Sequence, residues 1–206
     1  MDPARVADRT AGWLGVAFLV ALLASEAALS LPDEKATAAA VAAFYTAHRA
    51  VIIVLQVVGF AACVLLAMFA WRWRAVDRTV AVSGVILAVA ALAPGIVTVL
   101  VAVAADLDSP AASGRYNRLE PRGDDLLFVG VALFAVAVVV RLGRTRPWLG
   151  AVAAVTAVCC LLRLTLEALG RDRGFLDTLA PISFLVLVAA LTVLAFRGYP
   201  RAQPAG

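Results

Sequence analysis

The sequence contains very few of the residues that build cofactor and metal sites. Of its 206 residues one is histidine, His48, and one is lysine, Lys35. A single histidine cannot supply a bis-histidine haem or a histidine-rich metal site within one chain. Because Lys35 lies outside the apolar runs, a retinal Schiff base is excluded as well. The P-loop, G-x-S-x-G and H-E-x-x-H patterns are absent, so we expect neither a metal nor a cofactor.

Cysteine is also scarce. Cys63, Cys159 and Cys160 all lie inside apolar stretches, and none belongs to a C-x-x-C pair. A disulfide framework and a dithiol redox site are therefore not predicted. We interpret all three cysteines as small apolar packing residues.

Charged residues make up only 16% of the chain, whereas 64% of it is apolar and the mean hydropathy is +0.96. A soluble domain has about 25% charged and about 45–50% apolar residues, so this composition predicts a membrane protein. Sheet edges cannot face lipid, so the spans should be helices and the fold all-α. We expect a single domain over residues 1–206 with six transmembrane helices. The predicted spans are 12–31, 50–71, 79–105, 126–140, 147–169 and 178–196.

The remaining charges separate by side of the membrane. The termini and the even-numbered loops hold an arginine excess, at Arg5, Arg9, Arg72, Arg74, Arg78, Arg141, Arg144, Arg146, Arg197 and Arg201. The odd-numbered loops hold more acids than bases, so the positive-inside rule places both termini in the cytoplasm. Trp13, Trp71, Trp73 and Trp148 lie at the same boundary and predict an interfacial aromatic belt. The net charge of +4 is thus an orientation signal, and no nucleic-acid partner is expected.

Two segments between the predicted spans contain further structural signals. Segment 32–49 places Pro32, Asp33 and Glu34 before a good helix-forming stretch, which predicts a short outer helix leading, with a bend, into the second span. Segment 106–125 lacks periodicity and predicts a loop or lid. Pro94 and Pro181 predict kinks in the third and sixth spans.

The segments RTAGWLGVAFLVALLAS, LPDEKATAAAVAAFYTAHR and WRWR resemble uncharacterised six-span integral membrane proteins of actinobacteria, mainly over residues 8–75. The resemblance implies the topology and supplies no activity. Together with the preference for arginine over lysine, it leads us to expect a bacterial inner-membrane location.

Three charged residues stand inside the spans, where a charge costs roughly 2.5–3.5 kcal/mol on insertion scales. These are Glu26, Arg163 and Glu167. Arg163 and Glu167 are four residues apart and share one helix face. We predict a polar cluster centred on these three in the outer half of the bundle. Its predicted rim is His48, Arg49, Gln56, Asp124 and Asp125.

Three functions remain open for this cluster. In the first, it converts a lipophilic small molecule by isomerisation, cyclisation or epoxide opening. Glu26 would then be the general acid, Glu167 its Arg163-paired partner, and His48 a proton relay; Tyr45, Arg49, Gln56, Asp124 and Asp125 would bind the ligand. In the second, it serves small-molecule or proton-coupled export, which in so small a chain favours a homodimer. In the third, the charges only hold helices in register within a scaffold or partner subunit.

Overall fold

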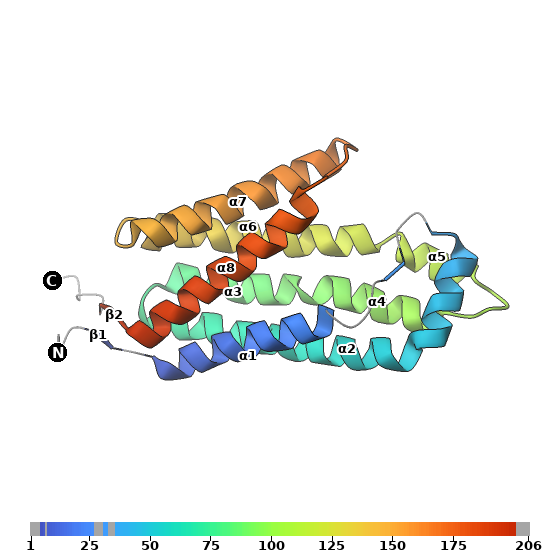
Figure 1. Cartoon of the computed structure of the whole chain (residues 1–206), viewed down its shortest axis with the longest axis horizontal. Coiled ribbons are helices and arrows are strands. Elements are labelled where there is room, and N and C mark those ends of the chain that lie inside the picture. The colour runs from blue at the N-terminus through green and yellow to red at the C-terminus, as the bar shows by residue number, and fades with distance from the viewer. Residues whose placement is uncertain (1–4, 7, 27–30, 33–35, 201–206) are drawn as a thin grey trace.

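A computed structural model of the chain describes residues 5–6, 8–26, 31–32 and 36–200. Helices dominate this part of the chain (Figure 1). In order, the elements are β1 (Arg5–Val6), α1 (Arg9–Glu26), α2 (Ala38–Arg72), the 3₁₀ helix η1 (Trp73–Ala75), α3 (Arg78–Ala90), α4 (Leu92–Ala104), α5 (Ala111–Asn117), α6 (Glu120–Leu142), α7 (Pro147–Ala168), α8 (Leu176–Arg197) and β2 (Tyr199–Pro200).

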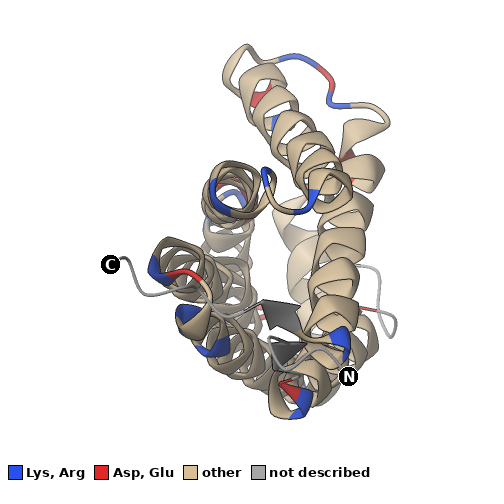
Figure 2. Cartoon of the chain, turned by 90° about the vertical axis from the view of Figure 1, so that its left-hand side faces the viewer, with Lys and Arg blue, Asp and Glu red and all other residues tan. Residues whose placement is uncertain are grey.

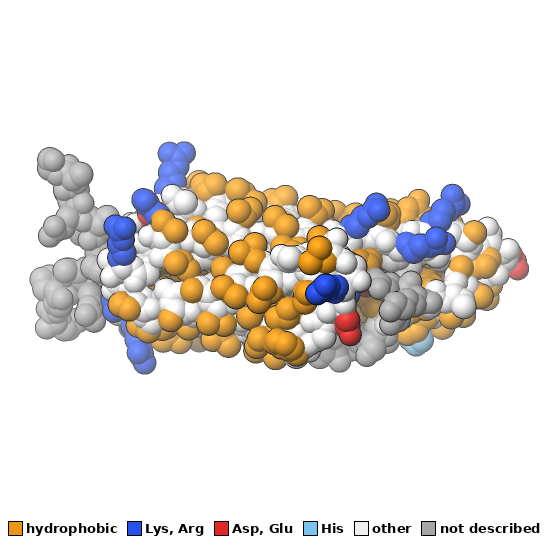
Figure 3. Space-filling view, turned by 90° about the horizontal axis from the view of Figure 1, so that it is seen from above, with side chains coloured by type: hydrophobic (Ala, Val, Ile, Leu, Met, Phe, Trp, Pro, Cys, Tyr) orange, Lys and Arg blue, Asp and Glu red, His pale blue; other side chains and the backbone are white. Residues whose placement is uncertain are grey.

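Six helical stretches are long and apolar enough to cross a membrane, which confirms the predicted all-α, six-span fold. Three of them combine neighbouring helices: α2 with η1, α3 with α4, and α5 with α6. In the space-filling view apolar side chains cover much of the surface, with basic side chains at the left-hand end and again from the middle toward the right (Figure 3). The protein is therefore a multi-pass membrane protein.

The spans pack as a closed ring. Each of α1, α2, α3, α6, α7 and α8 contacts the next, and α8 returns to α1. The two chain ends meet where β1 pairs antiparallel with β2, so both termini lie at the same end of the molecule (Figure 1). We call this the inner end and the opposite one the outer end.

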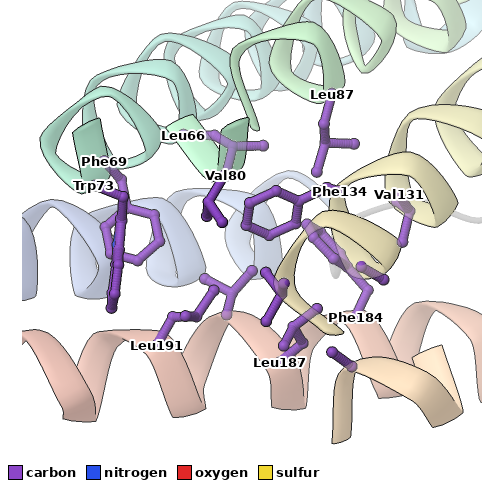
Figure 4. Packing of buried hydrophobic residues seen from close by; sticks show 14 of the residues in the cluster. Leu66, Phe69, Trp73, Val80, Leu87, Val131, Phe134, Phe184, Leu187 and Leu191 are labelled. Atoms are coloured by element: carbon purple, nitrogen blue, oxygen red, sulfur yellow. The ribbon is translucent and has the colours of Figure 1, made fainter. Parts of the chain in front are cut away.

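The centre of the ring is a core of buried aromatic and branched side chains. Phe69, Trp73, Phe134, Leu187 and Leu191 are all at most 1% exposed and point toward one another from four elements (Figure 4). Trp73 was expected in the interfacial belt, and that expectation is wrong: its ring packs edge-to-face on Phe69 at 6.3 Å. The other three predicted belt tryptophans are exposed.

Glycines let the helices of the ring approach closely. A methyl group at Gly84 of α3 would lie 2.6 Å from Cβ of Ala70 and 3.1 Å from the Phe134 ring. At Gly15 of α1 it would overlap Oγ1 of Thr192 in α8. Any larger residue at these two positions would push neighbouring spans apart.

The third span is divided at Ala91, three residues before Pro94, as the sequence predicts. Proline has no N–H to bond to the carbonyl four residues earlier, so α3 ends and α4 starts afresh with Pro94 in its first turn. In the sixth span α8 continues through Pro181 without ending.

The outer helix before the second span exists as the first part of α2, which is 35 residues or about 52 Å long. It crosses the outer end before the helix turns along the bundle (Figure 1). The helix begins after Thr37, whose hydroxyl oxygen accepts a hydrogen bond from the N–H of Ala40. The helix start expected at Asp33 and Glu34 lies outside the described residues.

The sequence predicts a loop or lid over residues 106–125, and the structure shows that this expectation is wrong. Residues 111–117 form α5, and α6 begins at Glu120, six residues before the predicted span. The Ser113 hydroxyl donates to the carbonyl of Ala104 at 3.2 Å, and a Cβ on Gly114 would come within 2.7 Å of Ala38. The segment is thus packed against α4 and α2. Together with a second apolar cluster around Val41 and Tyr45, it builds a cap at the outer end.

Candidate functional site

Arg163 organises the polar side of the outer end. It lies on the buried face of α7 and is only 3% exposed. Its Nε donates to Oδ1 of Asp177 at 3.0 Å, and Nη1 donates to Oδ1 of Asp125 at 3.3 Å. Nη2 lies 3.9 Å from Oδ2 of Asp124. The guanidinium also stands 4.0 Å above the Phe128 ring, so one residue ties α7 to both α6 and α8.

A second arginine extends this arrangement toward the surface. Arg173, in the connection between α7 and α8, lies 3.3 Å from a carboxylate oxygen of Glu167 and 3.2 Å from Oδ2 of Asp177. Asp177 therefore bridges the two guanidinium groups. The outer carboxylate network, as we name it, consists of Asp124, Asp125, Glu167 and Asp177 with Arg163 and Arg173.

Two glycines place Arg173 where it can reach this network. Gly170 follows the end of α7 at φ +63°, and Gly174 precedes α8 at φ +51°, both in the left-handed region that glycine tolerates best. The N–H of Arg171 donates to the carbonyl of Leu166, the bond that closes a helix at a Schellman motif. The connection between the helices is short and well bonded, so the position of Arg173 is set by the backbone.

An open cavity of about 690 Å³ adjoins the network, whose side chains form part of its lining. Its walls come from the segment after α1, the start of α6, the end of α7 and the connection to α8. The lining residues are Leu31, Pro32, Glu120, Pro121, Asp124, Glu167, Gly170, Arg171, Asp172, Arg173 and Asp177. Five of them are acids and two are arginines, so carboxylates dominate the walls.

The structure brings together only part of the predicted cluster. Arg163, Asp124 and Asp125 meet, and Glu167 joins them through Arg173 rather than through Arg163 as expected. The predicted Arg163–Glu167 pairing is therefore replaced by two linked pairs. Glu26 at the end of α1 is exposed, does not line the cavity and makes no ion pair within the described residues. It is close enough to Asp124 for their charges to interact.

The four remaining predicted residues belong to α2. Arg49 donates to the carbonyl of Ala105 at the end of α4, and the Nδ1 of His48 is 2.9 Å from the carbonyl of Phe44. Tyr45 is fully buried in the apolar cluster of the cap, on the side near Glu120. Gln56 faces α4, where its Oε1 would be 2.8 Å from a Cβ on Gly95. These side chains support the cap and the α2–α4 contact, and none lines the cavity.

Sequence reasoning missed the closest partners of Arg163. The predicted cluster includes neither Asp177 nor Arg173. One signal was available: Arg173 and Asp177 are four residues apart, the spacing at which opposite charges meet along a helix. The backbone turn that carries them back to α7 cannot be derived from that spacing.

No cluster of three or more histidine, cysteine or acidic residues able to hold a metal occurs among the residues that the structure describes. The three cysteines are free, with Cys159 and Cys160 buried. What the site offers chemically is a set of carboxylates fixed by two arginines beside an open cavity. Comparison of the chain with protein-family models, with curated proteins and with solved structures gives no match.

Proposed function

We propose that the protein binds a lipophilic small molecule in the outer cavity and converts it by acid–base chemistry. The observation that carries this proposal is the position of Asp124, which is at once a wall of the cavity and a member of the outer carboxylate network. The spans that form the ring expose apolar side chains on their outer surface. A lipophilic substrate can therefore reach the protein through the bilayer. Isomerisation, cyclisation and epoxide opening are reactions that such a site suits.

The carboxylates differ in how firmly they are held. Asp177 and Asp125 lie at 3.0 and 3.3 Å from Arg163, whereas Asp124 lies at 3.9 Å. A general acid or base must be able to approach a substrate atom to about 2.6–3.2 Å. We assign this role to Asp124 in place of Glu26, which does not line the cavity. Arg163 orients Asp124, and the Glu167–Arg173 pair forms another part of the cavity wall.

The test is the Asp124→Asn variant, which retains the shape of the side chain but cannot exchange a proton. Membranes that contain the wild-type chain are incubated with a bacterial lipid extract, and products are followed by mass spectrometry. We expect the variant to lose the product by at least about a hundredfold, the contribution typical of a general acid or base. Its thermal unfolding temperature should change little.

Asp108→Asn is the matched control, because Asp108 is an exposed acid at the outer end that does not line the cavity. It should leave product formation unchanged. Equal activity of the Asp124→Asn variant and the wild type would contradict the catalytic role. Parallel loss of activity and folding would favour the scaffold interpretation of the network.

One observation favours a second function, the export of a cationic lipophilic molecule. The cavity walls hold five acids and two arginines, which favours a positively charged guest over a neutral or negative one. Uptake of a fluorescent lipophilic cation into inverted vesicles measures this activity. Transport that survives Asp124→Asn while no conversion product forms would favour export and, with six spans, a homodimer.

We further propose that the inner end faces the cytoplasm of a bacterium and that the cavity opens on the outer side of its inner membrane. The arginine excess at the inner end supports this orientation. The exposed Trp13, Trp71 and Trp148 support an interface at the same level.

A further inference from the structure

The inner end has more arginines than its own acids can neutralise. Of the described acids there, Asp8 accepts from Arg72 and Asp77 accepts from Arg141, at 2.8 and 2.7 Å respectively. Both carboxylates are at most 13% exposed, so neither is available to other cations. Six arginines of this end have no carboxylate of another described residue within ion-pair distance: Arg9, Arg74, Arg78, Arg144, Arg146 and Arg197.

Four of these arginines come from two turns that an ion pair connects. Arg74 and Arg78 flank the α2–α3 turn, and Arg144 and Arg146 lie in the α6–α7 turn. The Arg141–Asp77 ion pair joins the two turns, and α3 packs along α6. We call these four residues the inner arginine patch. Figure 2 shows basic residues, in blue, at several of the helix ends that face the viewer.

Exposed tryptophans set the depth of the patch. Trp71 and Trp148 are 46% and 49% exposed and stand within three residues of Arg74 and Arg146, respectively. The Arg74 guanidinium lies 4.8 Å from the centroid of the Trp71 ring. Exposed indole rings favour the boundary between lipid tails and headgroups. The guanidinium groups therefore lie at the level of lipid phosphates rather than out in the aqueous phase.

From this geometry we propose that the inner arginine patch binds the headgroups of anionic phospholipids. Guanidinium groups pair with phosphate oxygens through parallel N–H donors. A lipid with a net negative headgroup also balances the uncompensated charge, which a zwitterionic lipid does not. The proposal concerns the end of the molecule opposite the cavity and does not depend on the proposed function.

The experiment measures which lipid the full-length protein retains. Protein purified in detergent is equilibrated with equal amounts of phosphatidylglycerol and phosphatidylcholine, separated from free lipid, and the retained lipids are quantified by mass spectrometry. We expect phosphatidylglycerol to be enriched, and the enrichment to fall as salt rises. The Arg74→Gln, Arg144→Gln double variant should lower it by about fivefold for each arginine removed.

The matched control removes two exposed arginines from the outer end, Arg115→Gln with Arg122→Gln, and should retain the wild-type enrichment. Inorganic phosphate should displace no more lipid than chloride does at the same ionic strength. Equal retention of both lipids by the wild type would overturn the proposal, as would an equal loss in the control variant. The salt titration uses the wild type alone, so the proposal stays open to refutation even if a double variant does not fold.

Two further outcomes assign the patch to another occupant. Displacement of more lipid by inorganic phosphate than by chloride would show recognition of the free anion. Binding of soluble polyglutamate to the protein in phosphatidylcholine nanodiscs, without any preference for phosphatidylglycerol, would show recognition of an acidic polypeptide. Either result would overturn lipid binding as the role of this surface.

Discussion

At the level of single residues, Arg163 has the most demanding environment in the described chain. Its charge is buried, and its stability there depends on carboxylates contributed by two other helices. The sequence identifies Arg163, because an arginine within an apolar run needs a partner. It does not identify Asp177 as that partner, since the choice depends on how α8 packs beside α7.

We predict that Arg163→Met destabilises the protein by about 1–3 kcal/mol. Removing one member of a fully buried pair costs about 3–5 kcal/mol, and the loss is smaller here because the facing carboxylates are 31–43% exposed. Arg173→Gln, at a more exposed arginine of the same network, should cost less than about 1 kcal/mol. Thermal unfolding in detergent measures both. If the Arg163→Met variant were as stable as the wild type, the network would not stabilise the packing of these helices.

At the level of elements, Asp77 both starts a helix and ties it to a neighbour. Its side chain accepts from the N–H groups of Thr79 and Val80 at the start of α3, and from Arg141 near the end of α6. Burial alone would raise the pKa of this carboxyl. The hydrogen bonds from Arg141, Val80 and Thr79 outweigh burial and hold the pKa below its ordinary value of 3.8.

The lowered pKa predicts an acid-sensitive contribution to stability. The unfolded chain takes up the proton more readily, so the contribution is complete above about pH 5 and is lost as the pH falls through 3.8 toward the lower value of the folded state. We expect the unfolding temperature of the wild type to drop over this window by more than that of Asp77→Asn. The asparagine variant retains a helix cap without the titrating charge.

Arg141→Gln provides the matched control, because it removes the principal partner that lowers the pKa and leaves the helix cap in place. It should reduce the acid-dependent drop in the same direction as Asp77→Asn. An acid response identical in all three proteins would contradict the assignment to this pair.

The six spans can be predicted from the sequence, whereas α5 and the start of α6 cannot. Long apolar runs predict the six spans because lipid leaves helix as the only backbone solution. Helix α5 was taken for a loop because its seven residues include a glycine and a serine and have no periodicity of their own. It forms through contacts with α2 and α4, including that of Ser113 with Ala104. Likewise, α6 extends back to Glu120 where Gly123 packs against the backbone of Pro94.

At the level of the whole molecule, the separation of charge along the bundle makes a prediction about topology. In a background with the three cysteines replaced by alanine, Ser109→Cys and Arg144→Cys place single thiols at opposite ends. We expect a membrane-impermeant maleimide to label Ser109→Cys in intact cells and Arg144→Cys only after the membrane is opened. The reverse pattern would invert the orientation, and labelling of both from outside would contradict the single membrane crossing between them, which α5 and α6 form.

The closure of the ring by its first and last spans has a consequence for biosynthesis. Helix α1 packs against α8 through Phe18 and Phe184, whose ring centroids are 6.2 Å apart, and through the close approach of Gly15 to Thr192. A ribosome delivers α1 to the membrane before α8. Until α8 inserts, this side of α1 lacks its native partner, and the ring can close only after that step.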